Sequence, residues 1–155
     1  MTDKRNFSSK ELPGFISDIP SMVNREQAKM MIAEWDRKGY YKSAWLSKNM
    51  EDQYGIRASG FNGKRLHEVY SLAEGGRMHS HVQKAIDSRR IVRLVSHITT
   101  QRGNFWQDTT FIPSTNLDRS QNVIGIIYDI TTIREKESQL QEEFKYIGLL
   151  NQRCP

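Results

Sequence analysis

The sequence predicts an α+β fold in which small helices pack on an antiparallel β-sheet. Three consecutive segments between residues 91 and 130 are rich in β-branched and aromatic residues and are separated by polar turns, which is typical of an antiparallel meander. Two further strand-like segments lie at 30–36 and 40–45, and short helices are favoured between the two groups. At 155 residues with 37% hydrophobic side chains, the chain is long enough for one domain with additional arms.

The first half of the chain is predicted to contain a polar arm, an amphipathic helix, a hairpin and a short helix. Apolar residues recur at helical spacing over Glu11–Ile19, and Pro20 ends that segment. The strands MMIAEWD and YYKSAW are joined by a turn in which Gly39 can take a positive φ. The next segment, Leu46–Tyr54, is amphipathic, and Gly55 is a plausible helix end.

The second half is predicted to run from one longer helix into the meander and then into a last helix. Gly75-Gly76 is expected to break the chain, and the helix is expected over Met78–Asp87. The three strands are IVRLVSHITT, FWQDTTFIP and NVIGIIYDI, the second of which we expect to stop at Pro113. From Thr132 onward the residues are charged and favour a helix.

These elements resemble the PAS family, in which small helices pack across one face of a five-stranded antiparallel sheet. The similarity rests on the hairpin MMIAEWDRKGYYKSAW, on ASGFNGKRLHEVY with its glycine-lysine pair before a leucine, and on GIIYDIT followed by Arg134 and Glu137. PAS domains commonly end their last strand with an aspartate, an apolar residue and a threonine, and then enter a signalling helix. The resemblance implies an N-terminal arm and cap helix over 1–27, a PAS core over 28–131 and a C-terminal signalling or linker helix over 132–155.

The resemblance implies a sensory module that binds a small signal or a partner and passes the change through its last helix. We expect a covalently linked output domain in the native protein, a transcription regulator first, and a histidine kinase or a cyclic-dinucleotide enzyme next. The sequence holds no Walker-type phosphate loop, zinc-protease motif or nucleophile elbow, so we do not expect an enzyme. Its N-terminus is polar and no apolar run is long enough to cross a membrane, which predicts a cytoplasmic protein.

A small organic ligand would lie between the sheet and the small helices. Aromatic rings would supply apolar surface, while tyrosine hydroxyls, His97 or Thr99 could orient the ligand. An ordinary filled core is the alternative, because aromatic residues are common in strands. The predicted lining residues are Tyr41, Trp45, Phe61, Tyr70, His97, Thr99, Phe105, Phe111 and Tyr128.

The alternation of side chains along a strand narrows this set. Tyr41, Ser43 and Trp45 are expected to share one face of their strand, and Val95 and His97 one face of theirs. The sequence leaves open which face points inward.

Haem and flavin are the cofactors to consider, and neither has a specific motif in this sequence. Haem-binding PAS proteins take an axial histidine from the helix before the meander, where His79 and His81 lie. The two are two positions apart, so only one could face a pocket. The alternative is that both are solvent-facing or helix-initiating residues near Arg77. A LOV-type flavin sensor needs a reactive cysteine, whereas segment 54–62 has none and the only cysteine is Cys154. We therefore predict no metal and no specific cofactor.

The end of the third meander strand is the predicted signal relay. Asp129 and Thr131 can cap the start of the following helix by accepting hydrogen bonds from its free amides. Beyond them, apolar residues follow a coiled-coil seam that Glu137 interrupts. This seam predicts a dimerising linker and hence a homodimer, and the alternative is a helix that packs back on its own domain. The seam residues are Ile133, Leu140, Phe144 and Ile147.

The second functional hypothesis is a ligand-free protein-interaction or dimerisation module with a closed core. In that case an apolar patch on the N-terminal helix would need a partner, and it consists of Leu12, Phe15, Ile16 and Ile19. The net charge of +5 does not form a basic stripe, because acidic and basic residues are mixed along the chain. We therefore interpret the charge as a solvated surface and not as a nucleic-acid footprint.

Overall fold

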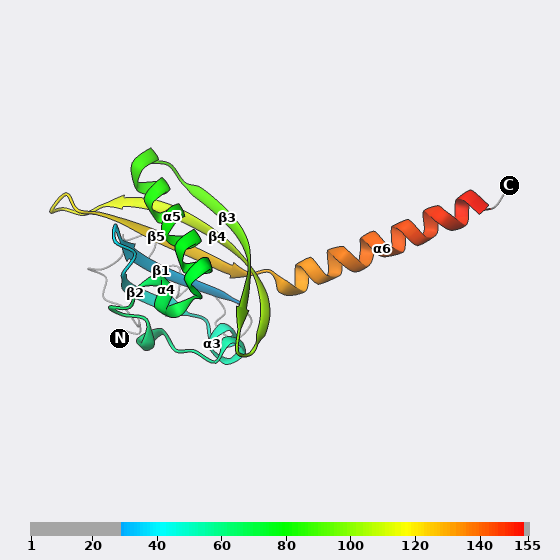
Figure 1. The fold of residues 1–155 in the computed structure, drawn as a ribbon, viewed down its shortest axis with the longest axis horizontal. Coiled ribbons are helices and arrows are strands. Elements are labelled where there is room, and N and C mark those ends of the chain that lie inside the picture. Colours follow the sequence, from blue (N-terminus) through cyan, green and yellow to red (C-terminus); the bar gives the residue numbers. More distant parts are fainter. Residues whose placement is uncertain (1–28, 154–155) are drawn as a thin grey trace, which may run out of the picture.

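The computed structural model describes residues 29–153, and its centre is one antiparallel sheet in the strand order β2-β1-β5-β4-β3 (Figure 1). The predicted hairpin pairs β1 with β2, and the predicted meander pairs β3 with β4 and β4 with β5. The α+β prediction is therefore confirmed. The helix expected over Glu11–Ile19 lies outside the described residues. The strands are β1 (Met30–Asp36), β2 (Tyr41–Leu46), β3 (Val92–Thr100), β4 (Gly103–Thr115) and β5 (Gln121–Asp129).

Short helices fill the connection between the second and third strands, and α5 crosses one face of the sheet (Figure 1). Ser47 begins α3 by accepting a hydrogen bond from the Met50 amide, and Gly55 ends it in the left-handed conformation, as the sequence predicts. The helices are α3 (Lys48–Tyr54), the 3₁₀ turn η1 (Ala58–Gly60), α4 (Leu66–Val69), α5 (Leu72–Ser88) and, after β5, α6 (Thr131–Arg153).

Helix α5 begins earlier than predicted, and the pair Gly75-Gly76 lies inside it. Ser71 caps the helix, because its hydroxyl accepts a hydrogen bond from the Glu74 amide at 3.2 Å. A Cβ atom on Gly75 would lie 2.5 Å from the Cα of His67. The glycine therefore permits α4 to approach α5 closely, and it does not break the chain.

Strand β4 continues through Pro113, where the sequence had predicted its end. The first residue of β3, Val92, pairs with Phe111, so β4 beyond this point pairs with β5 alone. A strand segment with one open edge can hold a proline, because the missing N–H then removes no hydrogen bond from the sheet.

A β-bulge determines which side chains of β2 face inward. Trp35 pairs with Tyr41, but the preceding residue, Glu34, pairs with Ser43, so one extra residue lies in β2. Tyr41 therefore joins Trp35 in the main core, whereas Trp45 belongs to a second buried cluster with Met30, Ile32 and Ile124. The expectation that Tyr41, Ser43 and Trp45 share one face is wrong for this reason.

Helix α6 is 23 residues long and extends away from the sheet beyond the end of β5 (Figure 1). Its predicted seam residues Ile133, Leu140, Phe144 and Ile147 are between 49% and 69% exposed, so this helix does not pack back on its own sheet. Within residues 29–153, no helix combines the length and the apolar character needed to cross a membrane.

Candidate functional site

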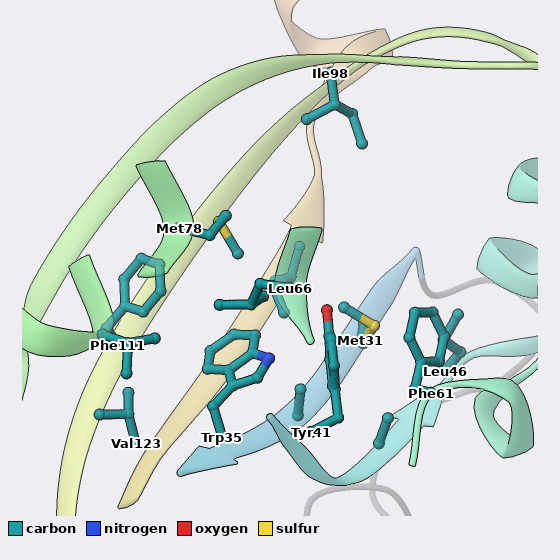
Figure 2. Close-up of a cluster of buried hydrophobic side chains, with 14 of the residues drawn as sticks. Met31, Trp35, Tyr41, Leu46, Phe61, Leu66, Met78, Ile98, Phe111 and Val123 are labelled. Carbon is teal, nitrogen blue, oxygen red and sulfur yellow. The ribbon is translucent and has the colours of Figure 1, made fainter. Parts of the chain in front are cut away.

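Several buried polar atoms lack a good hydrogen-bond partner, and two of them lie next to each other inside the core, on the face of the sheet that α5 covers. Trp35 and Tyr41 are 0% and 1% exposed, and their rings meet edge to face with centroids 5.6 Å apart. Figure 2 shows the indole nitrogen of Trp35 turned toward Tyr41. Neither Trp35 Nε1 nor the Tyr41 hydroxyl has a hydrogen-bond partner in good geometry. Trp35 Nε1 and the Tyr70 hydroxyl are nevertheless close enough to the Tyr41 hydroxyl to influence the pKa of Tyr41. Because a buried donor without a partner costs stability, an acceptor placed at this point would be stabilised by both groups.

A chain of hydrogen bonds runs from the neighbouring Tyr70 to the end of β5. The Tyr70 hydroxyl donates to Gln107 Oε1 at 3.4 Å, and Gln107 Nε2 donates to the Tyr54 hydroxyl at 3.2 Å. The Tyr54 hydroxyl in turn donates to Asp129 Oδ2 at 2.8 Å. All three bonds point toward the carboxylate, so side chains alone connect Tyr70 to Asp129.

Burial keeps the tyrosines of this region protonated. Desolvation is the main cause that raises the pKa of Tyr41 well above its usual value, and the neighbouring Tyr70 adds to it. Desolvation likewise raises the pKa of Tyr70 to about 12. The pKa of Tyr54 is also raised, first by desolvation and further by the Asp129 carboxylate. The hydroxyls therefore remain hydrogen-bond donors at neutral pH, which fixes the direction of the chain.

Asp129 connects this chain to the first turn of α6. Its Oδ1 accepts a hydrogen bond from the Thr131 amide at 2.9 Å. The Thr131 hydroxyl accepts from the Trp106 amide of β4 at 2.9 Å, so it ties the helix to the sheet and does not cap the helix as predicted. The Arg134 guanidinium lies over the Trp106 ring, 4.1 Å from its centroid. The sheet thus holds α6 through the first residues of the helix.

Four of the nine predicted lining residues lie in the main core, and a fifth, Tyr70, is partly buried against it. Tyr41 contacts Phe61 at 5.1 Å between ring centroids, and Phe105 stacks on Tyr54 at 4.3 Å. These aromatic rings surround the hydrogen-bonded series Tyr70–Gln107–Tyr54–Asp129, called the polar chain below, with apolar surface. The five are Tyr41, Phe61, Tyr70, Phe105 and Phe111.

The other four predicted residues lie on the opposite face of the sheet. The bulge turns Trp45 into the second buried cluster, on the other side of the sheet from Tyr41. In β3 the buried residues are Ser96 and Ile98, so His97 and Thr99 point to the other side, where both are exposed. Tyr128 is 50% exposed. These four residues do not share a site with Tyr41.

Three residues of the polar chain and its surroundings were missing from the sequence prediction: Trp35, Tyr54 and Gln107. Gln107 lies between Phe105 and Thr109 in the buried register of β4, and a polar residue at such a position is a recognisable signal. The hydrogen bond of Tyr54 could not be predicted, because its partner Asp129 is 75 positions away in the sequence.

Each of the two histidines considered for haem has one ring nitrogen beside a backbone oxygen. His79 Nε2 lies 3.1 Å from the carbonyl oxygen of Arg37, and His81 Nδ1 lies 2.8 Å from that of Arg77. These contacts orient both rings. In the part of the chain that the structure describes, no group of three or more His, Cys, Asp or Glu side chains could hold a metal ion.

A cavity of about 920 Å³ lies beside α3 and η1, apart from the polar chain. Basic Lys48, Arg57 and Arg102 and acidic Glu51 and Asp52 are among its lining residues. None of the nine predicted ligand residues is among the described residues that line it.

Comparisons with solved structures find this fold in several bacterial receptors. VqmA from Vibrio cholerae matches with a TM-score of 0.60 and 15% identity over 77% of this chain and 51% of VqmA, so this chain spans about half of that protein. Another VqmA structure, bound to DPO, matches with a TM-score of 0.58 and 15% identity over 73% of this chain and 57% of VqmA. The quorum-sensing receptor PAS domain of RpfR from Cronobacter turicensis, in complex with BDSF, matches with a TM-score of 0.52 and 18% identity over 68% of this chain and 97% of that domain.

A sensory box histidine kinase/response regulator from Burkholderia thailandensis E264 matches with a TM-score of 0.54 and 15% identity over 86% of this chain and 96% of the other. At these identities the structural matches show the fold alone. No curated protein matches the sequence significantly. A family model described as the PAS fold covers residues 26–135. The chain therefore belongs to the PAS family of sensory and signal-transduction domains.

Proposed function

We propose that this PAS domain senses a small, uncharged organic molecule that binds beside Trp35 and Tyr41. The observation that carries the proposal is the pair of neighbouring buried donors, Trp35 Nε1 and the Tyr41 hydroxyl, neither of which has an acceptor in good hydrogen-bond geometry. Both groups are neutral, so they favour a ligand that offers a hydrogen-bond acceptor, and the surrounding aromatic rings favour an apolar or aromatic body. The likeness to VqmA bound to DPO and to RpfR in complex with BDSF supports a small-molecule ligand.

The polar chain is the proposed route from the ligand to α6. Tyr70 lies beside Tyr41 and donates to Gln107 over a long 3.4 Å bond, which a ligand acceptor can compete for. Loss of that bond frees Gln107 to move relative to Tyr54, and Tyr54 holds Asp129 at the root of α6. A signal requires that this series of hydrogen bonds has two arrangements and that the ligand binds one of them more tightly than the other.

A second copy of this chain is the proposed partner of α6. The helix is about 34 Å long at 1.5 Å per residue, and a solvent-exposed helix of this kind needs its apolar residues covered. The heptad spacing of Leu140, Phe144 and Ile147 fits a parallel α6 of the second copy. A linked transcription regulator is the first expectation for the output, supported by the likeness to dimeric VqmA, whose target is DNA. A histidine kinase is the next.

Ligand binding is tested by native mass spectrometry of the purified chain, with absorbance, followed by titration with DPO and BDSF. Tyr41→Phe removes the inward hydroxyl and should weaken binding at least about tenfold, the effect of one lost hydrogen bond in a buried site. Ser43→Ala is the matched control, because Ser43 is equally buried and without a hydrogen-bond partner for its hydroxyl, yet lies on the other face. A chain that retains no small molecule from cells and binds neither probe would favour the interaction module instead.

The partner of α6 is tested by Leu140→Asp. A charge at a seam position should convert the dimer to monomer in sedimentation, while the thermal unfolding of the domain stays unchanged. Gln139→Asp introduces the same side chain on the same helix outside the seam, and its dimer should persist. Equal behaviour of the two variants would show that the seam does not join two copies.

A further inference from the structure

A second cavity, of about 530 Å³, lies at the end of the sheet farthest from α6. It is formed where the end of α5 meets the hairpin between β4 and β5, and Figure 1 shows this hairpin and α6 at opposite ends of the sheet. Two arginines, Arg89 and Arg119, line it together with Ser114, Thr115 and Gln121. The lining therefore combines two positive charges with hydroxyl and amide groups.

Both arginines have a backbone conformation that favours glycine. Arg89 has φ 56° and Arg119 has φ 68°, and in the described residues they are the two non-glycine residues with positive φ. Arg89 follows the last turn of α5, a position that glycine usually occupies. Strained residues of this kind often occur at ligand sites, where the side chain has a task that glycine cannot perform.

The hydrogen bonds around Arg119 fix the backbone of its turn and, among the described residues, leave both guanidinium groups of the cavity without a counter-charge. The Arg119 amide donates to the Asn116 carbonyl at 2.9 Å, and the carboxylate of the adjacent Asp118 accepts from the amide and hydroxyl of Ser120. Within residues 29–153, neither guanidinium takes part in an ion pair or a hydrogen bond. Arg37 donates to Gln121 Oε1 at 2.8 Å, which leaves the Gln121 amide N–H groups available as donors.

We infer that this cavity binds the phosphate group of a small phosphate monoester. A guanidinium presents paired N–H groups that match two phosphate oxygens, and hydroxyl and amide donors such as those of Ser114, Thr115 and Gln121 complete the shell of a dianion. Ile86 and Pro113 offer an apolar wall for the organic part of the ligand. The volume lies in the range of small-ligand sites and exceeds what phosphate alone would fill.

Isothermal titration of the full chain with phenyl phosphate tests the inference, with inorganic phosphate and phenol as comparison ligands. Arg89→Gly combined with Arg119→Gly should weaken phenyl phosphate binding at least tenfold. Glycine suits both backbone conformations, so the melting temperature of this variant should stay the same or rise. Lys48→Gln combined with Arg57→Gln is the matched control: it removes the same charge from the cavity beside α3 and should leave binding within twofold.

Four results would overturn the inference. The wild-type chain could fail to bind phenyl phosphate at millimolar concentration, or the double glycine variant could bind it as well as wild type does. The control variant could lose as much affinity as the glycine variant, which would indicate a general charge effect. Inorganic phosphate could bind as tightly as phenyl phosphate, which would exclude recognition of the organic part.

Discussion

The interior of the sheet and helix α6 differ in what stabilises them. Phe111 in the interior is fully buried and packs against Trp35 with ring centroids 5.7 Å apart, whereas Phe144 on α6 is 69% exposed. Residues of the same chain cover the interior, whereas the apolar residues of α6 are exposed. The packed interior therefore accounts for stability, and α6 is the proposed route to an output. Asp129 and Thr131 make hydrogen bonds where the two regions meet.

Deleting the same ring in the two regions should give the largest contrast. Phe111→Ala should lower the free energy of unfolding by about 3–5 kcal/mol, because it leaves a cavity among tightly packed side chains. Phe144→Ala should change it by less than about 0.5 kcal/mol at protein concentrations where the chain is monomeric. Urea denaturation of both variants measures the difference. A large loss in Phe144→Ala would mean that α6 packs on the domain.

Alkaline pH should destabilise the interior through its tyrosines. In the folded chain the pKa of Tyr70 is about 12, above the value near 10 of an unfolded chain. The folded state therefore holds this proton more tightly, so its contribution is complete below pH 10 and is lost as the pH rises toward 12. Urea midpoints of wild type and Tyr70→Phe between pH 8 and pH 11 isolate the effect. The wild type should lose more stability over this range, and parallel curves would exclude a buried phenol.

Removing single hydroxyls from the polar chain should give smaller, graded losses. Tyr54→Phe leaves Asp129 Oδ2 and the Gln107 amide without their partner and should cost about 1–3 kcal/mol of unfolding free energy. Tyr70→Phe removes only the 3.4 Å bond at the other end of the chain, and its cost at neutral pH should be the smaller of the two. The reverse order would place the critical contact at Tyr70 and not at Asp129.

The features of the fold that could be predicted from the sequence were those determined by neighbouring residues. Alternating β-branched residues predicted the strands, and Gly55 predicted the end of α3, because each is a property of neighbouring residues. The face of the sheet to which each side chain points was less predictable. One extra residue in β2 puts Tyr41 and Trp45 on opposite faces, and the sequence contains no clear mark of that bulge.

The candidate site was harder to predict than the fold, because its contacts join distant segments. Tyr41 and Phe61 were expected beside the ligand, and both lie in the core, but Tyr54 meets Asp129 across 75 positions. The position of Arg119 likewise could not be predicted from the residues around it. Nothing in the segment LDRS predicts that its backbone takes a positive φ and that it lines one cavity with Arg89.

Hydrogen exchange at the start of α6 tests the central claim, that the interior controls the root of this helix. In α6 the Arg134 amide donates to the Ile130 carbonyl at 2.9 Å, which makes a peptide covering residues 130–140 a reporter. Tyr54→Phe should accelerate exchange in this peptide well beyond Tyr70→Phe, with residues 141–149 changing less. Exchange in 130–140 that is identical in wild type and Tyr54→Phe would show that α6 is held independently of the polar chain, and would contradict the account.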